Sequence, residues 1–135
     1  MVRVVSGIAI DRYHRLLMVR KNGVWILPGG KIKKGEYDLE RLFREFREEL
    51  PHAWATVLAE GKIFHGNAPH SKKKISVKTY FVEITNSIDV AQEIEQAKWV
   101  KEGDFGNYPM SEVMADVIAH LIFEGKYLSK KKIIQ

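Results

Sequence analysis

The sequence predicts an α/β fold in which a mixed β-sheet carries one helix packed on each face. Strand-like segments lie before, between and after only two helical segments, which is typical of this arrangement. Hydrophobic residues make up 45% of the 135 residues, enough for a core, and no linker or repeat divides the chain. A single domain over residues 1–135 is therefore expected.

Segments rich in β-branched and aromatic residues, separated by turn residues, predict the strands. Asn22-Gly23 marks a tight turn, and the proline and three glycines of residues 28–35 predict a loop. An irregularity is expected near Gly61, and a polar loop over residues 65–74. The expected strands are residues 2–10, 16–20, 24–27, 54–64, 75–85 and 98–100.

Two segments have the hydrophobic period of an α-helix. In the first, residues 37–50, apolar residues recur at steps of three and four until Pro51 ends the pattern. In the second, Ser111 is the expected N-cap and Gly125 the expected C-cap of a helix with one apolar stripe. The basic segment 126–135 is expected to form a frayed tail.

Composition excludes several classes of protein. The chain has no cysteine, which excludes disulfides and thiolate metal sites. Charged residues make up 29%, and no apolar run approaches the roughly 18 residues that a membrane span needs. Residues 1–10 lack the order of a signal peptide, so a cytoplasmic location is expected. The net charge of +5, gathered in lysine clusters, suits either a polyanionic partner or a well-solvated surface.

The first helix carries three carboxylates on one face. On a helical wheel Glu45, Glu48 and Glu49 lie beside the apolar face, at the rim where the helix meets the sheet. Like charges this close repel one another, and the helix dipole disfavours negative charge in the last turn. A bound divalent cation would relieve the repulsion, because hard cations take carboxylate oxygens. The alternative is a solvated, salt-bridged surface, with relief from Arg41, Arg44 and Arg47.

The loop and helix together resemble the Nudix box over residues 30–52. That motif reads G-x5-E-x7-R-E-U-x-E-E-x-G-U, where U is a bulky aliphatic residue. Phe46 stands at the first U position, and the preceding W-I-L-P-G-G is similar to the usual lead-in of the family. The resemblance implies a Nudix-type α/β/α sandwich. The glycine and charged residues that match at the correct spacing are Gly30, Glu36, Arg44, Glu45, Glu48 and Glu49.

Two positions depart from the motif. Pro51 stands where the family has glycine, and His52 stands where it has an apolar residue. Glycine allows a positive φ just past a helix, whereas the φ of proline is fixed near −65°. Proline also pushes Leu50 out of helical geometry. The helix is therefore expected to end about one residue early, which leaves Glu45 in place and the direction of Glu49 open.

The resemblance implies metal-dependent hydrolysis of a diphosphate linkage in a nucleoside diphosphate joined to another group. The implied cofactor is Mg²⁺ or Mn²⁺, and the implied ligands are Glu45, Glu48, Glu49 and the Gly30 carbonyl. The three glutamates and Arg44 are the expected catalytic residues, with Arg44 orienting the carboxylates through a charge-assisted bond.

Further residues are expected to support this site. Glu36 is expected to anchor the loop to the helix, and Gly29 lets the backbone approach a ligand closely. Glu93 or Glu95 is expected to supply another carboxylate. Loop lysines and histidines are expected to contact the substrate: Lys31, Lys33, Lys72, Lys74, His65 and His70.

A small nucleotide is the expected substrate, with a nucleoside triphosphate or a nucleotide sugar as the first choice. Trp25 or Tyr80 would stack a base only if it faced the site instead of the core. The alternatives are hydrolysis of a dinucleoside polyphosphate or capped RNA, or a non-catalytic Nudix-fold nucleotide-binding regulator. The retention of every box glutamate favours an enzyme. The base, the leaving group and a homodimeric state stay open.

Overall fold

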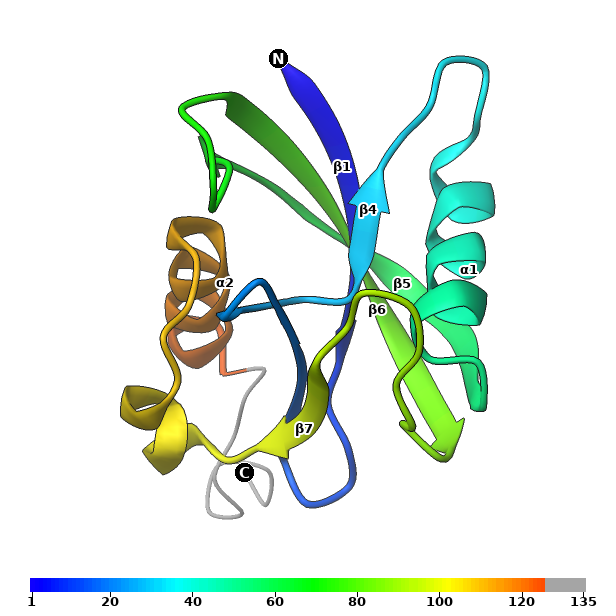
Figure 1. Ribbon diagram of the computed structural model, residues 1–135. Coiled ribbons are helices and arrows are strands. Elements are labelled where there is room, and N and C mark those ends of the chain that lie inside the picture. The colour runs from blue at the N-terminus through cyan, green and yellow to red at the C-terminus, as the bar shows by residue number, and fades with distance from the viewer. Residues whose placement is uncertain (126–135) are drawn as a thin grey trace.

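The structure, a computed structural model, describes residues 1–125, and the expected tail at 126–135 lies outside the described residues (Figure 1). The secondary structure follows the order ββββ-α-βββ-η-α. The strands are β1 (Val2–Ala9), β2 (Leu16–Lys21), β3 (Val24–Ile26), β4 (Gly29–Lys31), β5 (Ala53–Asn67), β6 (Lys74–Asn86) and β7 (Gln96–Val100). The helices are α1 (Asp38–Glu49), the short 3₁₀ helix η1 (Glu102–Asn107) and α2 (Glu112–Phe123).

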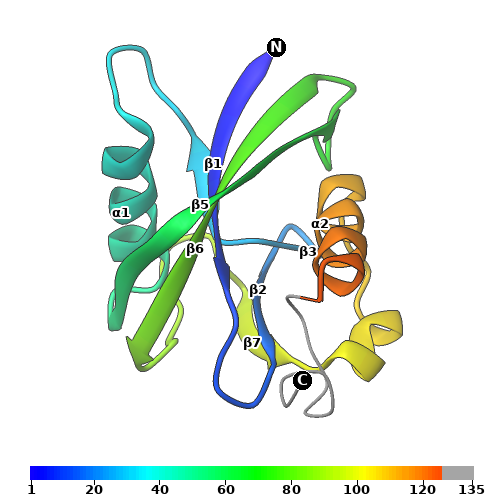
Figure 2. The ribbon, with the colours of Figure 1, turned by 180° about the vertical axis from the view of Figure 1, so that it is seen from behind.

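The strands form two sheets instead of one. The larger sheet has the order β4-β1-β6-β5, in which β1 and β6 run parallel and the other pairs antiparallel. The smaller sheet has the order β3-β2-β7 and is antiparallel. Seen from either side, α1 and α2 lie on opposite sides of the strands (Figures 1 and 2). The expected α/β/α arrangement is thus confirmed, with the mixed sheet divided in two.

Each helix buries its apolar stripe in a separate core. Leu42, Phe46 and Leu50 of the first helical segment pack with residues of β1, β2 and β6. The ring of Phe46 lies so near Gly7 that a Cβ there would stand 3.1 Å from ring carbons, so the glycine lets α1 approach β1 closely. On the other side, α2 packs its stripe against Phe64 and neighbouring strands. Within residues 1–125 neither helix, at 12 residues each, is long enough to cross a bilayer.

Two loops were predicted too long. Gly29–Lys31 lies inside the predicted loop 28–35, yet it forms β4, because main-chain pairing with β1 needs no strand-forming side chains. The polar loop expected over 65–74 covers only residues 68–73, since β5 and β6 continue pairing as far as Asn67 and Lys74. The irregularity near Gly61 is confirmed: the pairing register shifts between Glu60 and Ile63.

Three of the predicted helix-end features can be compared with the structure, and the C-cap of α2 is Glu124 instead of the expected Gly125, which follows it with φ 72°. Helix α1 ends at Glu49, and Leu50 has φ −133° and ψ 70°, so the early end before Pro51 is confirmed. The Leu50 N–H still donates to the Phe46 carbonyl at 2.8 Å, which keeps its side chain fully buried. At α2 the Ser111 side chain accepts a hydrogen bond from the Met114 N–H at 3.1 Å, as expected of an N-cap.

Pro51 should stabilise the fold mainly by lowering the conformational entropy of the unfolded chain. We expect Pro51→Ala to lower the free energy of unfolding by about 0.4–1 kcal/mol, because the variant chain gains backbone freedom when unfolded. Leu50→Ala, which empties a fully buried site, should cost about 2–5 kcal/mol. Urea denaturation measures both values. A loss at Pro51 as large as that at Leu50 would contradict this account of the helix end.

Candidate active site

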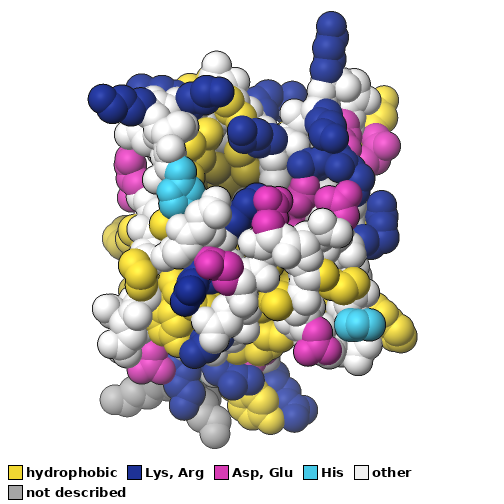
Figure 3. Space-filling model, in the orientation of Figure 1, with side chains coloured by type: hydrophobic (Ala, Val, Ile, Leu, Met, Phe, Trp, Pro, Cys, Tyr) yellow, Lys and Arg dark blue, Asp and Glu magenta, His cyan; other side chains and the backbone are white. Residues whose placement is uncertain are grey.

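A pocket of about 550 Å³ opens between α1, β4 and the start of α2. Figure 3 shows a hollow with hydrophobic side chains inside it and acidic and basic side chains gathered on the side toward α1. The charged end is lined by Lys21, Lys31, Lys33, Arg41, Arg44, Glu45, Glu48, Glu49 and Glu93. The apolar end is lined by Val4, Ile26, Leu27, Ala68, Pro69, Ile75, Val77, Val113 and Met114.

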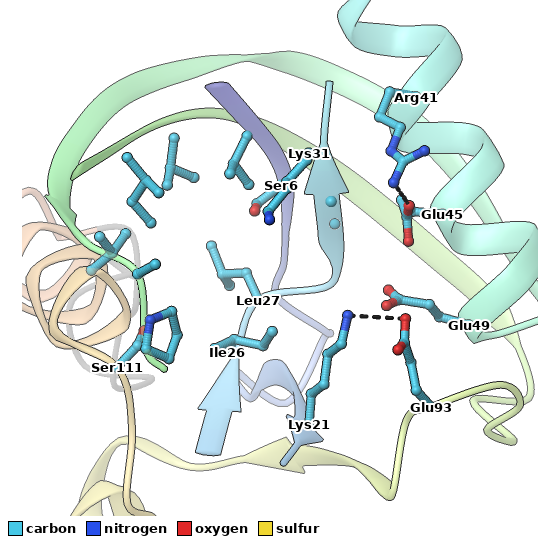
Figure 4. A pocket seen from close by; sticks show the side chains of 18 of the residues that line it. Ser6, Lys21, Ile26, Leu27, Lys31, Arg41, Glu45, Glu49, Glu93 and Ser111 are labelled. Carbon is cyan, nitrogen blue, oxygen red and sulfur yellow. Dashed lines mark ion pairs between the residues drawn. The ribbon is translucent and has the colours of Figure 1, made fainter. Parts of the chain in front are cut away.

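Helix α1 directs a stripe of three charged side chains into this pocket. Arg41, Glu45 and Glu49 follow one another at steps of four residues, and as whole residues they are 9%, 7% and 3% exposed. In Figure 4 the Arg41 guanidinium meets the Glu45 carboxylate, and Glu49 lies below them. Glu48, by contrast, keeps 46% of its side chain exposed at the rim. The predicted rim position therefore fits Glu48, whereas Glu45 and Glu49 lie deeper because the β4 strand covers them.

The glycines of β4 make this burial possible. A Cβ at Gly30 would lie 2.5 Å from Oε1 of Glu45, so only a glycine leaves room for the carboxylate. A Cβ at Gly29 would lie 2.1 Å from the Val5 carbonyl oxygen, so that glycine serves the pairing of β4 with β1. The backbone N–H of Gly29 also lowers the pKa of the Glu49 carboxyl, against the larger effect of burial. The loop and helix are thus locked together at the carboxylates.

Burial raises the pKa of both inward-facing carboxylates. The pKa of Glu45 is raised by burial, against the opposing effect of the Arg41 charge. Burial raises the pKa of Glu49 to about 8, with a further contribution from the nearby Glu45 charge. Lys21 and the Gly29 N–H oppose that shift without cancelling it. The Oε1 atom of Glu49 is buried without a hydrogen-bond partner, which marks a position where a cation would be favourable.

Arg44 and Glu36 brace the loop against the helix, as predicted. The Arg44 guanidinium donates to Glu36 Oε2 from two nitrogens, at 2.6 and 3.1 Å. Glu36 Oε1 accepts from the Lys33 N–H at 3.0 Å. The Lys33 N–H and the Arg44 guanidinium hold the pKa of Glu36 below its ordinary value. Arg44 also lies 3.6 Å from Glu48, so it aligns the carboxylate at the rim.

The segment 87–95 closes one side of the charged end. The Ala91 N–H donates to the Glu49 carbonyl at 3.0 Å, which ties this segment to the end of α1. Glu93 then reaches the pocket, where its Oε1 lies 3.0 Å from Lys21 Nζ (Figure 4). Glu95 instead accepts from the Gly23 N–H at 2.8 Å and holds the tight turn. Of the two glutamates considered from the sequence, Glu93 is the one at the pocket.

Several predicted substrate contacts do not reach this pocket. The side chains of His65, His70, Lys72 and Lys74 are exposed and none of them lines it. The loop that joins β5 to β6 borders the pocket through Ala68 and Pro69 instead.

The two aromatic candidates also face the core. Trp25 packs edge-on against Tyr108, with ring centroids 5.0 Å apart. The Tyr80 hydroxyl donates to Asp38 at 3.4 Å. Among the residues that the structure describes, no aromatic side chain lines the pocket.

Sequence reasoning missed Lys21 and the α2 end of the pocket. Lys21 lies 24 positions before Glu45, and no local pattern links them until β2 and α1 pack together. Met114 was assigned only to the apolar stripe of the second helix, and Val113 was not assigned. A helical period cannot show which end of a stripe meets a cavity. Arg41 did carry a signal, because it precedes Glu45 by one helical turn.

The residues at the charged end fit a divalent cation, although they do not converge on one point. Within residues 1–125 no group of three or more acidic or histidine side chains is close enough to hold a metal ion. Arg41 holds Glu45 and Lys21 holds Glu93, so these two carboxylates are each engaged by a side-chain cation. The unpartnered Glu49 oxygen and the absence of a side chain at Gly30 are the two features that suit an added cation.

The two glycines of β4 should respond differently to a methyl group. We expect Gly30→Ala to displace Glu45 and weaken Mn²⁺ binding about tenfold or more, with modest loss of stability. Gly29→Ala should destabilise the fold by about 3 kcal/mol, because its Cβ meets backbone. Calorimetric metal titration and urea denaturation separate the two effects. Equal effects of both variants on metal binding would sink this assignment.

The high pKa of Glu49 should appear in the pH dependence of stability without metal. The folded pKa of Glu49, about 8, exceeds the ordinary value of 4.5. The contribution of this carboxyl to the free energy of unfolding is therefore fully present below about pH 4.5 and is lost as the pH rises through 8. With a chelator present, the melting temperature of Glu49→Gln relative to wild type should therefore rise between pH 5 and 8.5. Parallel curves for the two proteins would refute the burial of an ionisable Glu49.

The comparisons with known proteins agree with this geometry. The family model of the NUDIX domain matches residues 1–121. No curated protein matches the chain significantly. Three similar solved structures are the Escherichia coli ORF135 protein, the MutT protein from Methanosarcina mazei Go1 and an ADP-ribose pyrophosphatase from Streptococcus suis.

These structures share the fold over most of their length. The ORF135 protein is 24% identical with a TM-score of 0.70, and 90% of each chain is covered. The MutT protein is 21% identical with a TM-score of 0.74, covering 93% of this chain and 95% of that one. The ADP-ribose pyrophosphatase is 16% identical with a TM-score of 0.68, covering 88% and 90%. With the family model spanning residues 1–121, the chain belongs to the Nudix family of hydrolases, which act on pyrophosphate bonds.

Proposed function

We propose that the protein hydrolyses a diphosphate linkage in a nucleoside triphosphate or a nucleotide sugar, with the help of Mg²⁺ or Mn²⁺. The observation that carries the proposal is the pairing, in one pocket, of buried carboxylates with five cationic side chains. Buried glutamates suit a metal and cationic side chains suit phosphates, so the charged end matches a metal-bound diphosphate. The apolar end, beyond β4, suits the non-phosphate part of the substrate.

The expected metal ligands are Glu45, Glu48, Glu49 and the Gly30 carbonyl oxygen. A divalent cation held there would neutralise phosphate charge and lower the pKa of a bound water. Glu49 has to lose its proton to serve as a ligand, because its pKa lies near 8 in the metal-free protein. Binding of the cation should therefore release a proton from the Glu49 carboxyl.

The side chains around this centre divide the remaining tasks. Glu45 is the residue that we assign to orient the attacking water and accept its proton at a carboxylate oxygen. Arg44, fixed by Glu36, keeps the Glu48 carboxylate aligned. Lys31 and Lys33 stand exposed at the mouth, where they attract the phosphates of an arriving nucleotide.

The apolar end limits how a base is held. Its side chains are aliphatic, apart from Ser111 and the methionine of α2, so a base would be enclosed between aliphatic surfaces and not stacked on a ring. Nothing in this end selects one base or one sugar by a buried charged group. Solved structures with the same fold carry names as different as MutT and ADP-ribose pyrophosphatase. The substrate therefore has to be found by assay.

A nucleotide panel with Mg²⁺ or Mn²⁺ tests the proposal. We expect turnover of at least one nucleoside triphosphate or nucleotide sugar, and a rate at least about 100-fold lower for Glu48→Gln, which removes a metal ligand. Glu83→Gln, an exposed glutamate on β6 outside the pocket, is the matched control and should keep the wild-type rate.

The other outcomes discriminate the alternatives. Cleavage restricted to dinucleoside polyphosphates or capped RNA would identify one of those substrate classes instead. Nucleotide binding without turnover of any substrate would favour a non-catalytic regulator. Turnover that Glu48→Gln leaves unchanged would overturn the site assignment.

A further inference from the structure

Arg41 is a buried cation whose hydrogen-bonding capacity is mostly unused. Its side chain is 11% exposed, and it lines the charged end of the pocket. Its Nη2 meets Oε1 of Glu45, whereas Nε and Nη1 are buried with no partner. These two nitrogens carry three of the five N–H donors of a guanidinium, and leaving buried donors unpaired is costly. Figure 4 shows the guanidinium above Glu45, with the ion pair between them.

The other cations of the pocket differ from Arg41. Arg44 is held by Glu36 and Glu48, and Lys21 by Glu93. Lys31 and Lys33 are exposed, so water satisfies their ammonium groups. In the part of the chain that the structure describes, Arg41 is thus the pocket cation that combines burial with unpaired donors.

Among the described residues 1–125, the anionic partner of Arg41 is Glu45, which has a second role in the proposed function. Glu45 is the carboxylate that the proposed metal centre requires, and a carboxylate shared with a divalent cation neutralises an arginine less well. Glu36 already accepts from the Lys33 N–H and the Arg44 guanidinium, and these two donors lower its pKa, as the Arg41 charge also does. A buried guanidinium that loses its counter-ion is strongly destabilised, so a second anion is needed when the site fills. The anion that reaches this pocket is the phosphate of the substrate.

We propose that Arg41 is a substrate-binding residue that takes a non-bridging phosphate oxygen of the diphosphate. In the metal-free protein the guanidinium stays paired with Glu45 until a substrate binds. When the diphosphate enters, the guanidinium turns from Glu45 and donates its unpaired N–H groups to phosphate, for which the planar fork is well suited. This assignment rests on the proposed function, since it assumes a diphosphate in the pocket.

The competing explanation is that Arg41 only positions Glu45. The two readings differ in what Arg41→Met should change. A positioning residue would alter metal binding, because Glu45 would lose its orientation. A phosphate ligand would alter anion binding even when the metal site is saturated.

The test measures two affinities by calorimetry in the full-length protein. The first is the affinity for Mn²⁺ alone. The second is the affinity for methylenediphosphonate at saturating Mn²⁺, and this diphosphate analogue cannot be hydrolysed. We expect Arg41→Met to bind Mn²⁺ as well as wild type or better, and the diphosphonate about 10- to 100-fold more weakly. Arg41→Lys, which keeps the charge but not the fork, should show an intermediate loss. Arg47→Met, an exposed arginine on the same helix, is the control and should match wild type.

A loss of diphosphonate affinity below fivefold for Arg41→Met overturns the proposal, as does an equal loss for Arg47→Met. If circular dichroism shows that Arg41→Met is unfolded, Arg41→Lys decides, and a loss below threefold overturns the proposal. Because the analogue is not hydrolysed, the result does not depend on turnover. If no nucleotide of the panel were turned over, the proposed reaction would be refuted, but the assignment of Arg41 as an anion-binding residue would not.

Discussion

The contact between β4 and helix α1 is the constraint on which the site depends. A side chain at Gly30 would occupy the space of the Glu45 carboxylate, and one at Gly29 would enter the backbone of β1. Gly7 on β1 in turn receives the ring of Phe46. Three glycines on two adjacent strands thus bring the helix and the strands closer than side chains would permit, and the carboxylates are buried as a result.

This closeness has an electrostatic cost. Glu49, in the last turn of α1, opposes the helix dipole, and burial raises the pKa values of both Glu45 and Glu49. Arg41, Lys21 and the Gly29 N–H offset part of the cost, yet Glu49 keeps an unpaired oxygen. A divalent cation bound there, as proposed, would offset this cost, because a ligand that binds only the folded state stabilises it.

The two ends of the pocket are built by different means. The charged end comes from one continuous segment of loop and helix, assisted by Lys21 and by Glu93, which the Ala91–Glu49 bond holds close to α1. The apolar end is assembled from β1, β3, β6, the loop before β6 and the first turn of α2. Under the proposed function, the first end would handle the pyrophosphate chemistry, and the second end would contact the rest of the substrate.

The sequence by itself determined most of the fold and the part of the charged end that α1 supplies. The helical period placed the three glutamates on one face and Pro51 predicted the early helix end, because both depend on local backbone geometry. The resemblance to the Nudix box implied that Glu36 anchors the loop to the helix. Tertiary structure alone decided that Glu45 and Glu49 are buried and that Gly29–Lys31 forms a strand. It also decided that Lys21 lines the pocket and that His65 and the neighbouring loop residues His70, Lys72 and Lys74 do not. These features depend on which segments pack together, and no period or spacing in a single sequence records contacts between residues far apart in the chain.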